Sequence, residues 1–192
     1  MEWLEKIDQE IVLFINGLNH PFLDEIMWLL SDKYALIPFY IFLLYLISKR
    51  YSTKFAFQFL IIAALTILVV DQLSVYAFKE VFQRYRPSHH AELKNQLHFY
   101  TSSNGDQYFG GKYGFVSSHA ANMMVLVTLT FPLFQEDKMW VNTMLIVMAI
   151  FVMYSRIYLG VHYLSDILVG SFLGFSIAFF VNKFTLSKWR SS

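Results

Sequence analysis

Three short segments hold most of the side chains in this sequence that could bind an anion or transfer a proton. In the first, Lys79 and Arg86 stand seven residues apart, and Pro87 follows directly. Residues seven apart lie on one face of a helix about two turns apart, so we expect the two cations to point the same way. The proline is then expected to end the helix.

The second segment, Ser117-Ser118-His119, stands where a long apolar stretch begins. Serine hydroxyls at such a position can cap the first amides of a helix. The unpaired N–H groups of a helix N-terminus also attract anions. The pattern predicts a helix start that presents amides and an imidazole to a bound anion.

The third segment contains Arg156, Gly160, His162 and Asp166. His162 and Asp166 are four residues apart, so the carboxylate can hydrogen-bond one ring nitrogen and hold the imidazole in one tautomer. Arg156 precedes His162 by six residues, and the two would diverge on a continuous helix. Gly160 supplies the break that lets both side chains face one pocket.

In order and spacing, the three segments resemble the signature of the type 2 phosphatidic acid phosphatase family: Lys-x6-Arg-Pro, Pro-Ser-Gly-His and Ser-Arg-x5-His-x3-Asp. The first and third elements match in full, while the middle element has Val116 for the proline and Ser118 for the glycine. The resemblance covers about residues 55–182. It implies a helical bundle like that of the soluble vanadium haloperoxidases.

The resemblance also implies a role for each matched residue. His162 is similar to the family's nucleophile, which forms a phosphohistidine. His119 is similar to the general acid that protonates the leaving oxygen and then activates water. Asp166 is expected to stay ionised and orient His162. The expected ligands of the phosphoryl oxygens are Lys79, Arg86, Ser117, Ser118 and Arg156.

Other polar residues receive structural interpretations. Arg84 points away from Arg86 and is grouped with the cations that extend from helix ends to the membrane surface. For Asp71, in the middle of an apolar stretch, we favour a hydrogen bond to a neighbouring helix over a proton relay.

The long loop between the first and second motifs contains four candidate metal ligands: His89, His90, Glu92 and His98. Their spacing matches no strict metal-binding pattern, so we expect no metal and no cofactor. The loop is expected to form a rim whose aromatic residues touch the headgroup or the interface: Tyr100, Tyr108, Phe109 and Tyr113.

Composition indicates an integral membrane protein. Of the 192 residues, 56% are hydrophobic and 15% are charged, against roughly 25% charged in soluble domains. The length suits a single domain over residues 1–192. The absence of cysteine excludes a disulfide framework and a cysteine nucleophile, and a net charge of +1 gives no field for nucleic acid. No obligatory protein partner is inferred.

Five stretches are apolar enough to be candidate membrane spans. They are Tyr34–Ser48, which needs an extension toward Trp28 or Tyr51, Phe55–Phe78, Tyr113–Gln135, Met139–Ser155 and Ile167–Asn182, which extends back to about Tyr163. We therefore predict an all-α membrane protein with about five transmembrane helices, six being the alternative. Residues 55–182 form the core that carries the three motifs.

Residues 1–30 are expected to lie on the membrane rather than across it. Apolar residues recur at helical spacing with acidic residues between them, as in an interfacial amphipathic helix. The apolar residues are Trp3, Leu4, Ile7, Ile11, Phe14 and Ile15. Asn19-His20-Pro21 breaks this helix, and a second short helix is expected over Phe22–Leu30.

These spans place the motifs on one side of the membrane. Apart from the three proposed phosphate ligands, that side carries five Lys or Arg residues and the opposite side seven. The positive-inside rule then favours motifs outside the cytoplasm, and the extracytoplasmic sites of the family's members favour the same answer. We expect a bacterial inner membrane protein.

The expected function is metal-independent hydrolysis of a phosphate or pyrophosphate on a membrane lipid. The motifs bind phosphate, so undecaprenyl diphosphate, lipid A, phosphatidylglycerophosphate and phosphatidate all remain candidate substrates. Two alternatives come from other classes. A transporter or scaffold with a degenerate site is suggested by Val116 and Ser118, and a haloperoxidase is disfavoured by the apolar spans.

Overall fold

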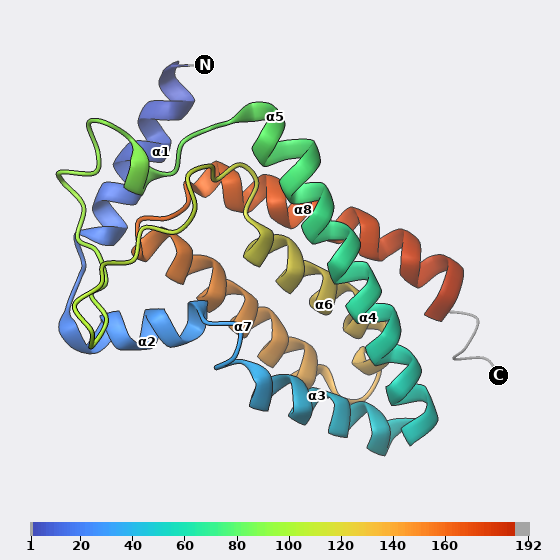
Figure 1. Cartoon of the computed structure of the whole chain (residues 1–192). Helices are drawn as coiled ribbons and strands as arrows, with labels where there is room; N and C mark the ends of the chain where they lie inside the picture. The colour runs from blue at the N-terminus through green and yellow to red at the C-terminus, as the bar shows by residue number, and fades with distance from the viewer. Residues whose placement is uncertain (1, 187–192) are drawn as a thin grey trace.

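The computed structural model describes residues 2–186, and these residues form a helical bundle. The two N-terminal helices are α1 (Glu2–Asn16) and α2 (Pro21–Ser31). The five long helices are α3 (Ile37–Arg50), α4 (Thr53–Leu73), α6 (Ser118–Phe134), α7 (Met139–Tyr158) and α8 (Leu164–Val181). Short segments complete the chain: η1 (Ser74–Lys79), α5 (Glu80–Phe82), η2 (Pro87–His89) and η3 (Asn182–Leu186). In Figure 1 the five long helices run side by side.

The fold is that of an all-α membrane protein, as predicted. Three stretches in the described chain are long and apolar enough to cross a bilayer: Thr53–Phe82, Met139–Tyr158 and Leu164–Thr185. Helix α6 is apolar but shorter. Helix α3 has 14 residues and spans about 21 Å, less than the roughly 30 Å hydrocarbon core. Crossing by α3 and α6, on which the count of five depends, stays a prediction.

Close packing of α6 against α8 brings the second and third motifs together. A Cβ atom added to Gly170 would lie only 2.5 Å from the Ser117 carbonyl oxygen, and one added to Gly174 would overlap the Ala121 backbone. Small residues permit such an approach between membrane helices. As a result the Ser117 amide donates a hydrogen bond to the Asp166 carbonyl, at 3.0 Å.

The polar segments gather at one end of the bundle. Figure 1 shows α1, α2 and the long segment between α5 and α6 at the end where α6 and α8 begin. Helix α7 contacts both α1 and α2. The three motifs therefore share one end of the molecule, and α8 leads away from it.

The N-terminal segment forms two helices with the predicted break between them. Pro21 starts α2, and the His20 imidazole accepts a hydrogen bond from the Phe22 amide at 3.2 Å. Trp3 and Phe14 are exposed, as an interfacial helix requires. Asp8 is one of the acidic residues between the apolar positions, which are expected on the polar face. It is instead buried, because α1 packs against α7 and α8.

Candidate active site

The path from Lys79 to Arg86 differs from the continuous helix that the spacing predicts. The helix ends at Phe82, because Gln83 adopts a left-handed backbone with φ 46°. Arg86 has extended backbone, and Pro87 begins the short helix η2 rather than ending a long one. The predicted shared helix face is therefore wrong, and the two cations reach the site by different routes.

His162 is held between a carboxylate and a guanidinium. Its Nδ1 lies 3.3 Å from Asp166 Oδ2, and its Nε2 lies 3.0 Å from Arg86 Nη1. A guanidinium only donates, so Nε2 accepts this bond and the ring proton belongs on Nδ1. This tautomer places a lone pair on Nε2.

Ionisable residues from all three motifs act on His162. The pKa of this histidine is held well below its ordinary value, first by burial and then by the charges of Arg86, Arg156, His119 and Lys79. The side chain is 1% exposed. The imidazole is therefore neutral at neutral pH, as the hydrogen bond from Arg86 also requires.

Arg156 carries a buried charge with unused donors. Its Nη2 donates to the Tyr108 hydroxyl at 3.0 Å, while its Nε and Nη1 are buried and have no hydrogen-bond partner within residues 2–186. A buried charged donor without a partner is costly. The arrangement is therefore suited to an oxyanion that takes up both groups.

Two glycines shape the pocket around the third motif. Gly160 has φ +67°, and the Val161 and His162 amides both turn back to the Arg156 carbonyl, at 3.1 and 3.2 Å. This turn is the break that the sequence predicts between Arg156 and His162. Gly114 was not anticipated: an added Cβ would lie 3.0 Å from Asp166 Oδ2.

The second motif starts a helix, as its serines predict. The Ser117 hydroxyl accepts a hydrogen bond from the Ala120 amide at 3.4 Å, and α6 begins at Ser118. The Ser118 hydroxyl lies 2.8 Å from Lys79 Nζ and 2.6 Å from the Ser74 hydroxyl. The hydroxyl of Ser118 thus binds a cation of the first motif.

His119 is oriented by a segment that no motif contains. Its Nε2 lies 3.2 Å from the Ser31 carbonyl oxygen at the end of α2. A carbonyl only accepts, so Nε2 carries a proton in this contact, and Nδ1 is the ring nitrogen that can gain or give up the second proton. The N-terminal helices therefore contribute to the site.

Arg84 does not extend to the membrane surface, so that interpretation is wrong. Its Nη1 lies 2.9 Å from Asp166 Oδ1, and its Nη2 lies 2.8 Å from Asp8 Oδ2. The guanidinium also covers the Tyr163 ring at 4.1 Å. Asp8 in turn accepts from the Ser165 amide at 3.0 Å. Arg84 joins α1 to the carboxylate that binds His162.

The long loop packs against α2 and α7. Tyr108 reaches Arg156, while Tyr100 is buried and stacks on Trp28 at 4.7 Å rather than forming a rim. His98, one of the loop's candidate ligands, lies 2.9 Å from Asp24. Within residues 2–186, no three His, Asp or Glu side chains are grouped as metal ligands.

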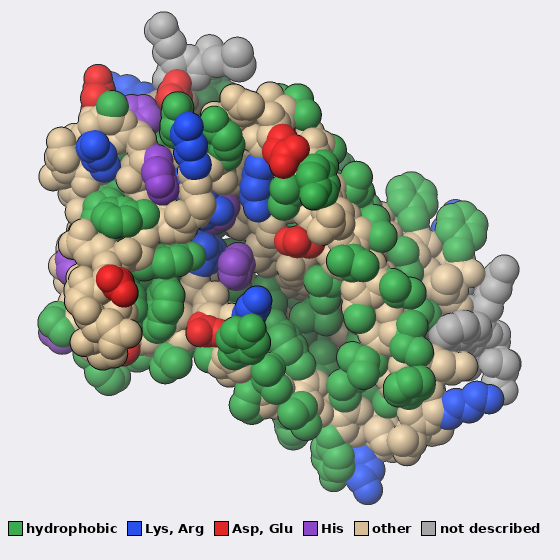
Figure 2. Space-filling view, in the orientation of Figure 1, with side chains coloured by type: hydrophobic (Ala, Val, Ile, Leu, Met, Phe, Trp, Pro, Cys, Tyr) green, Lys and Arg blue, Asp and Glu red, His purple; other side chains and the backbone are tan. Residues whose placement is uncertain are grey.

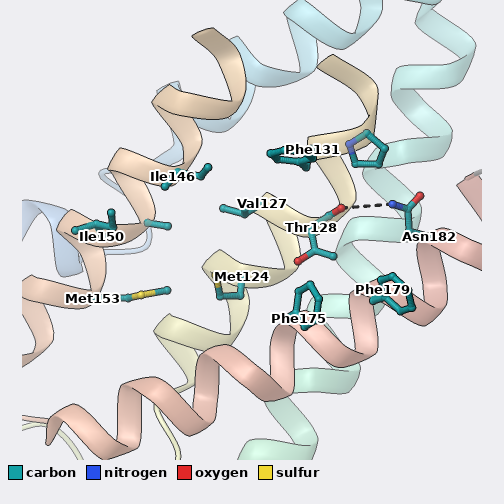
Figure 3. A pocket seen from close by; sticks show the side chains of 12 residues that line it. Met124, Val127, Thr128, Phe131, Ile146, Ile150, Met153, Phe175, Phe179 and Asn182 are labelled. Atoms are coloured by element: carbon teal, nitrogen blue, oxygen red, sulfur yellow. Dashed lines mark hydrogen bonds between the residues drawn. The ribbon is translucent and has the colours of Figure 1, made fainter. Parts of the chain in front are cut away.

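One cavity opens beside the second motif. It has a volume of about 640 Å³, lies between the α2–α3 segment, α4 and α6, and reaches Ser118 and His119. Figure 2 shows a hollow on this face, with charged side chains of both signs and a histidine at its edge. A cavity of about 560 Å³ between α6, α7 and α8 is almost wholly apolar and includes no motif residue (Figure 3).

Changing Ser118 to glycine tests what its hydroxyl does. We expect Ser118→Gly to keep kcat/KM for phosphate release within about tenfold of the parent, or roughly 1.4 kcal/mol. The backbone amide at the helix start is retained, and Lys79 loses one neutral partner. Ser118→Ala, which keeps the Cβ atom, is the matched control. A loss of several orders of magnitude in both variants would assign the hydroxyl a catalytic role.

Comparison with known proteins finds a matching family and similar proteins. The sequence matches the PAP2 superfamily over residues 57–190. It is 36% identical to a protein named lipid A 4′-phosphatase from Porphyromonas gingivalis, covering 98% of this chain and 78% of that protein. A protein of the same name from Bacteroides thetaiotaomicron is 33% identical, with 91% and 75% covered.

Two solved structures share the fold. The PAP2-type phosphatidylglycerolphosphate phosphatase of Bacillus subtilis has a TM-score of 0.67 at 21% identity, covering 97% of this chain and 88% of that one. Aquifex aeolicus LpxE has a TM-score of 0.62 at 22% identity, with 91% and 94% covered. At these identities the likeness concerns the arrangement of the helices.

Proposed function

We propose a substrate for this chain, which is a membrane lipid phosphatase and belongs to the PAP2 superfamily. It hydrolyses a phosphate monoester on a lipid of the lipid A type and releases inorganic phosphate. The names of its two relatives from Porphyromonas and Bacteroides support this choice among lipid phosphates. The observation that carries the chemistry is the buried Arg156, whose Nε and Nη1 have no partner within residues 2–186. Beside it stands His162, with a lone pair on Nε2.

The first step is attack on phosphorus by His162. The phosphate oxygens bind the unused donors of Arg156, and Arg86 turns from Nε2 to the phosphate. Nε2 then forms a P–N bond while the bond from phosphorus to the lipid oxygen breaks. His119 gives its proton to the departing oxygen. Asp166 stabilises the positive charge that develops on His162.

The second step releases phosphate. His119, now neutral, takes a proton from a water molecule, and the hydroxide attacks phosphorus as the P–N bond breaks. The electron pair returns to Nε2, and inorganic phosphate leaves. Throughout, Lys79, Arg86 and Arg156 stabilise the negative charge on the equatorial oxygens, where the transition state concentrates it.

Purified protein and a panel of lipids test this function. The panel contains bisphosphorylated lipid A, phosphatidate, phosphatidylglycerophosphate and undecaprenyl diphosphate, and His162→Ala serves as the inactive control. We expect the highest kcat/KM on lipid A, with mass spectrometry showing the loss of one phosphate. Preferred turnover of another lipid would overturn the substrate assignment. Release from none would favour a transporter or scaffold with a degenerate site.

The proposed mechanism predicts resistance to chelators. Phosphate release should survive EDTA, because histidine and three cations perform the roles that magnesium and carboxylates fill in other phosphatases. Vanadate should inhibit, since it mimics the trigonal-bipyramidal phosphorus. Loss of turnover in EDTA that magnesium restores would show that this mechanism is wrong.

We also propose that the site faces away from the cytoplasm in a bacterial inner membrane. The seven Lys and Arg residues of the segments predicted on the opposite side of the membrane support this orientation; two of them, Lys188 and Arg190, lie outside the described residues. A reporter that works only in the cytoplasm should be active when fused after Ser192. Activity of a periplasmic reporter at the same position would reverse the orientation.

A further inference from the structure

We propose that Asp71 and Asn122 form a hydrogen-bonding subsite for the sugar ring that carries the scissile phosphate. This subsite would favour aminosugar lipids over lipids with no hydrogen-bond donor near the phosphate. The inference rests on the proposed function and extends it from the phosphate pocket to the rest of the headgroup.

Both residues line the cavity that opens beside His119. Asn122 follows His119 by three residues on α6, so the two share a helix face. Asp71 precedes Ser74 by three residues, and the Ser74 hydroxyl contacts Ser118 at 2.6 Å. Each residue therefore lies about one helical turn, roughly 5.4 Å, beyond the phosphate pocket. That is about the distance from a sugar phosphate to the far side of its ring.

The polar groups of these two residues have no hydrogen-bond partner in the part of the chain that the structure describes. Asp71 is half-buried in the cavity wall, and within residues 2–186 its side chain makes no hydrogen bond and no ion pair, although its charge acts on Lys79. Asn122 Oδ1 is buried and also lacks a partner in that range. A carboxylate in a membrane-spanning helix and an unpaired amide are both costly. A polar ligand that enters the cavity would satisfy them.

Apolar side chains make up most of the remaining wall. They include Leu36, Ala64, Ile67, Leu68, Met123 and Val152. An acyl chain that follows the sugar ring can pack against them without losing its apolar environment. The cavity thus offers Ser118 and His119 to the phosphate, Asp71 and Asn122 to the sugar ring, and an apolar wall to the acyl chain. A phosphorylated glycolipid presents its groups in the same order.

The donors and acceptors of the subsite discriminate between lipids. A carboxylate only accepts hydrogen bonds, and a carboxamide both donates and accepts. The aminosugar of lipid A bears hydroxyl or amide N–H donors within one ring of its phosphate. Phosphatidate and polyprenyl phosphates have no such donor there, so they would leave the half-buried Asp71 carboxylate unpaired in the cavity wall. A site built around polar partners rejects a substrate that lacks them.

Two variants test the subsite against two substrates. Asp71→Asn and Asn122→Leu are compared with the parent for turnover of bisphosphorylated lipid A and of 4-nitrophenyl phosphate, which enters the phosphate pocket without a sugar. We expect kcat/KM on lipid A to fall about ten- to hundredfold in Asp71→Asn, where the hydrogen bond is to a charged group, and about tenfold in Asn122→Leu, where it is to a neutral amide. Turnover of 4-nitrophenyl phosphate should stay within about threefold.

Asn182→Leu is the matched control. Asn182 also lies on an apolar helix surface, in the cavity of Figure 3, and donates to the Thr128 carbonyl at 3.4 Å. It should leave both substrates unchanged. Equal losses on both substrates in Asp71→Asn would mean that Asp71 acts through Lys79, which overturns the subsite and leaves the proposed function intact. Failure of the parent to release phosphate from lipid A would overturn both.

Discussion

Replacing His162 with alanine is expected to abolish phosphate release for every leaving group. The first bond to phosphorus is formed by Nε2, and within residues 2–186 the hydrogen bond from Arg86 fixes the tautomer in which this nitrogen carries the lone pair. Without it neither a lipid alkoxide nor a nitrophenolate can be displaced. The measurement is trapping of labelled phosphoenzyme from an activated substrate, and His162→Ala should form none.

His119→Ala is expected to behave differently, because its role depends on the leaving group. An alkoxide needs a proton to depart and a nitrophenolate does not, so the first step should be spared with 4-nitrophenyl phosphate. The second step still lacks its base, and acid-labile phosphohistidine should accumulate on His162. Phosphohistidine in His162→Ala, or equal losses for both leaving groups in His119→Ala, would contradict these assignments.

The low pKa of His162 determines the pH dependence expected of kcat/KM. Since burial and the surrounding cations lower the pKa of His162, the nucleophile stays neutral as the pH falls below the ordinary histidine pKa of about 6.5. If protonation of His162 lowers kcat/KM at acidic pH, the midpoint of that decrease should therefore lie below about pH 6.5. Removing the charge of Arg86, as in Arg86→Gln, should move this limb to higher pH.

Arg84→Ala is expected to lower kcat by about a hundredfold, or roughly 2.7 kcal/mol, with a much smaller change in KM. The Asp166 side chain is fully buried and shares its two oxygens between Arg84 and His162. Without Arg84, two carboxylates, Asp8 and Asp166, face one another across the space that the guanidinium occupied. Breaking a buried pair by removing one partner is strongly unfavourable, so Asp166 no longer holds His162 in place.

Graded variants separate positioning from folding. Arg84→Lys keeps the charge but cannot contact Asp8 and Asp166 with two separate nitrogens, so its kcat should lie between those of Arg84→Ala and the parent. Asp8→Asn keeps the link between Arg84 and Asp166 and should cost about tenfold. Lys112→Ala is the control, because Lys112 is an exposed cation on the same loop that contacts the Tyr113 ring. If Arg84→Ala lowered thermal stability while kcat per folded molecule stayed unchanged, the positioning role would be wrong.

The local features of this protein could be read from its sequence. Apolar stretches predicted the long helices, because burial in a bilayer requires continuous apolar runs. The serines at 117 and 118 marked the start of α6, since hydroxyls cap helix amides. Gly160 marked the turn that folds His162 back toward Arg156, because a positive φ favours glycine.

The contacts that assemble the site were decided by the tertiary structure. Arg84 and Asp8 are 76 residues apart, and His119 and Ser31 are 88 apart. Helical periodicity describes neighbours three or four residues apart, so it carries no signal for such pairs. It even misplaced Arg86, because one left-handed residue, Gln83, redirected the chain.

Helix packing is the physical reason for this division. Gly170 lets α8 approach α6 until the Ser117 amide meets the Asp166 carbonyl, which joins the second and third motifs. The N-terminal helices then close over the same end and supply the Asp8 carboxylate to Arg84. The sequence by itself determined which groups could bind and transfer phosphate. Only the packed bundle determined which nitrogen of His162 carries the lone pair and which charges surround it.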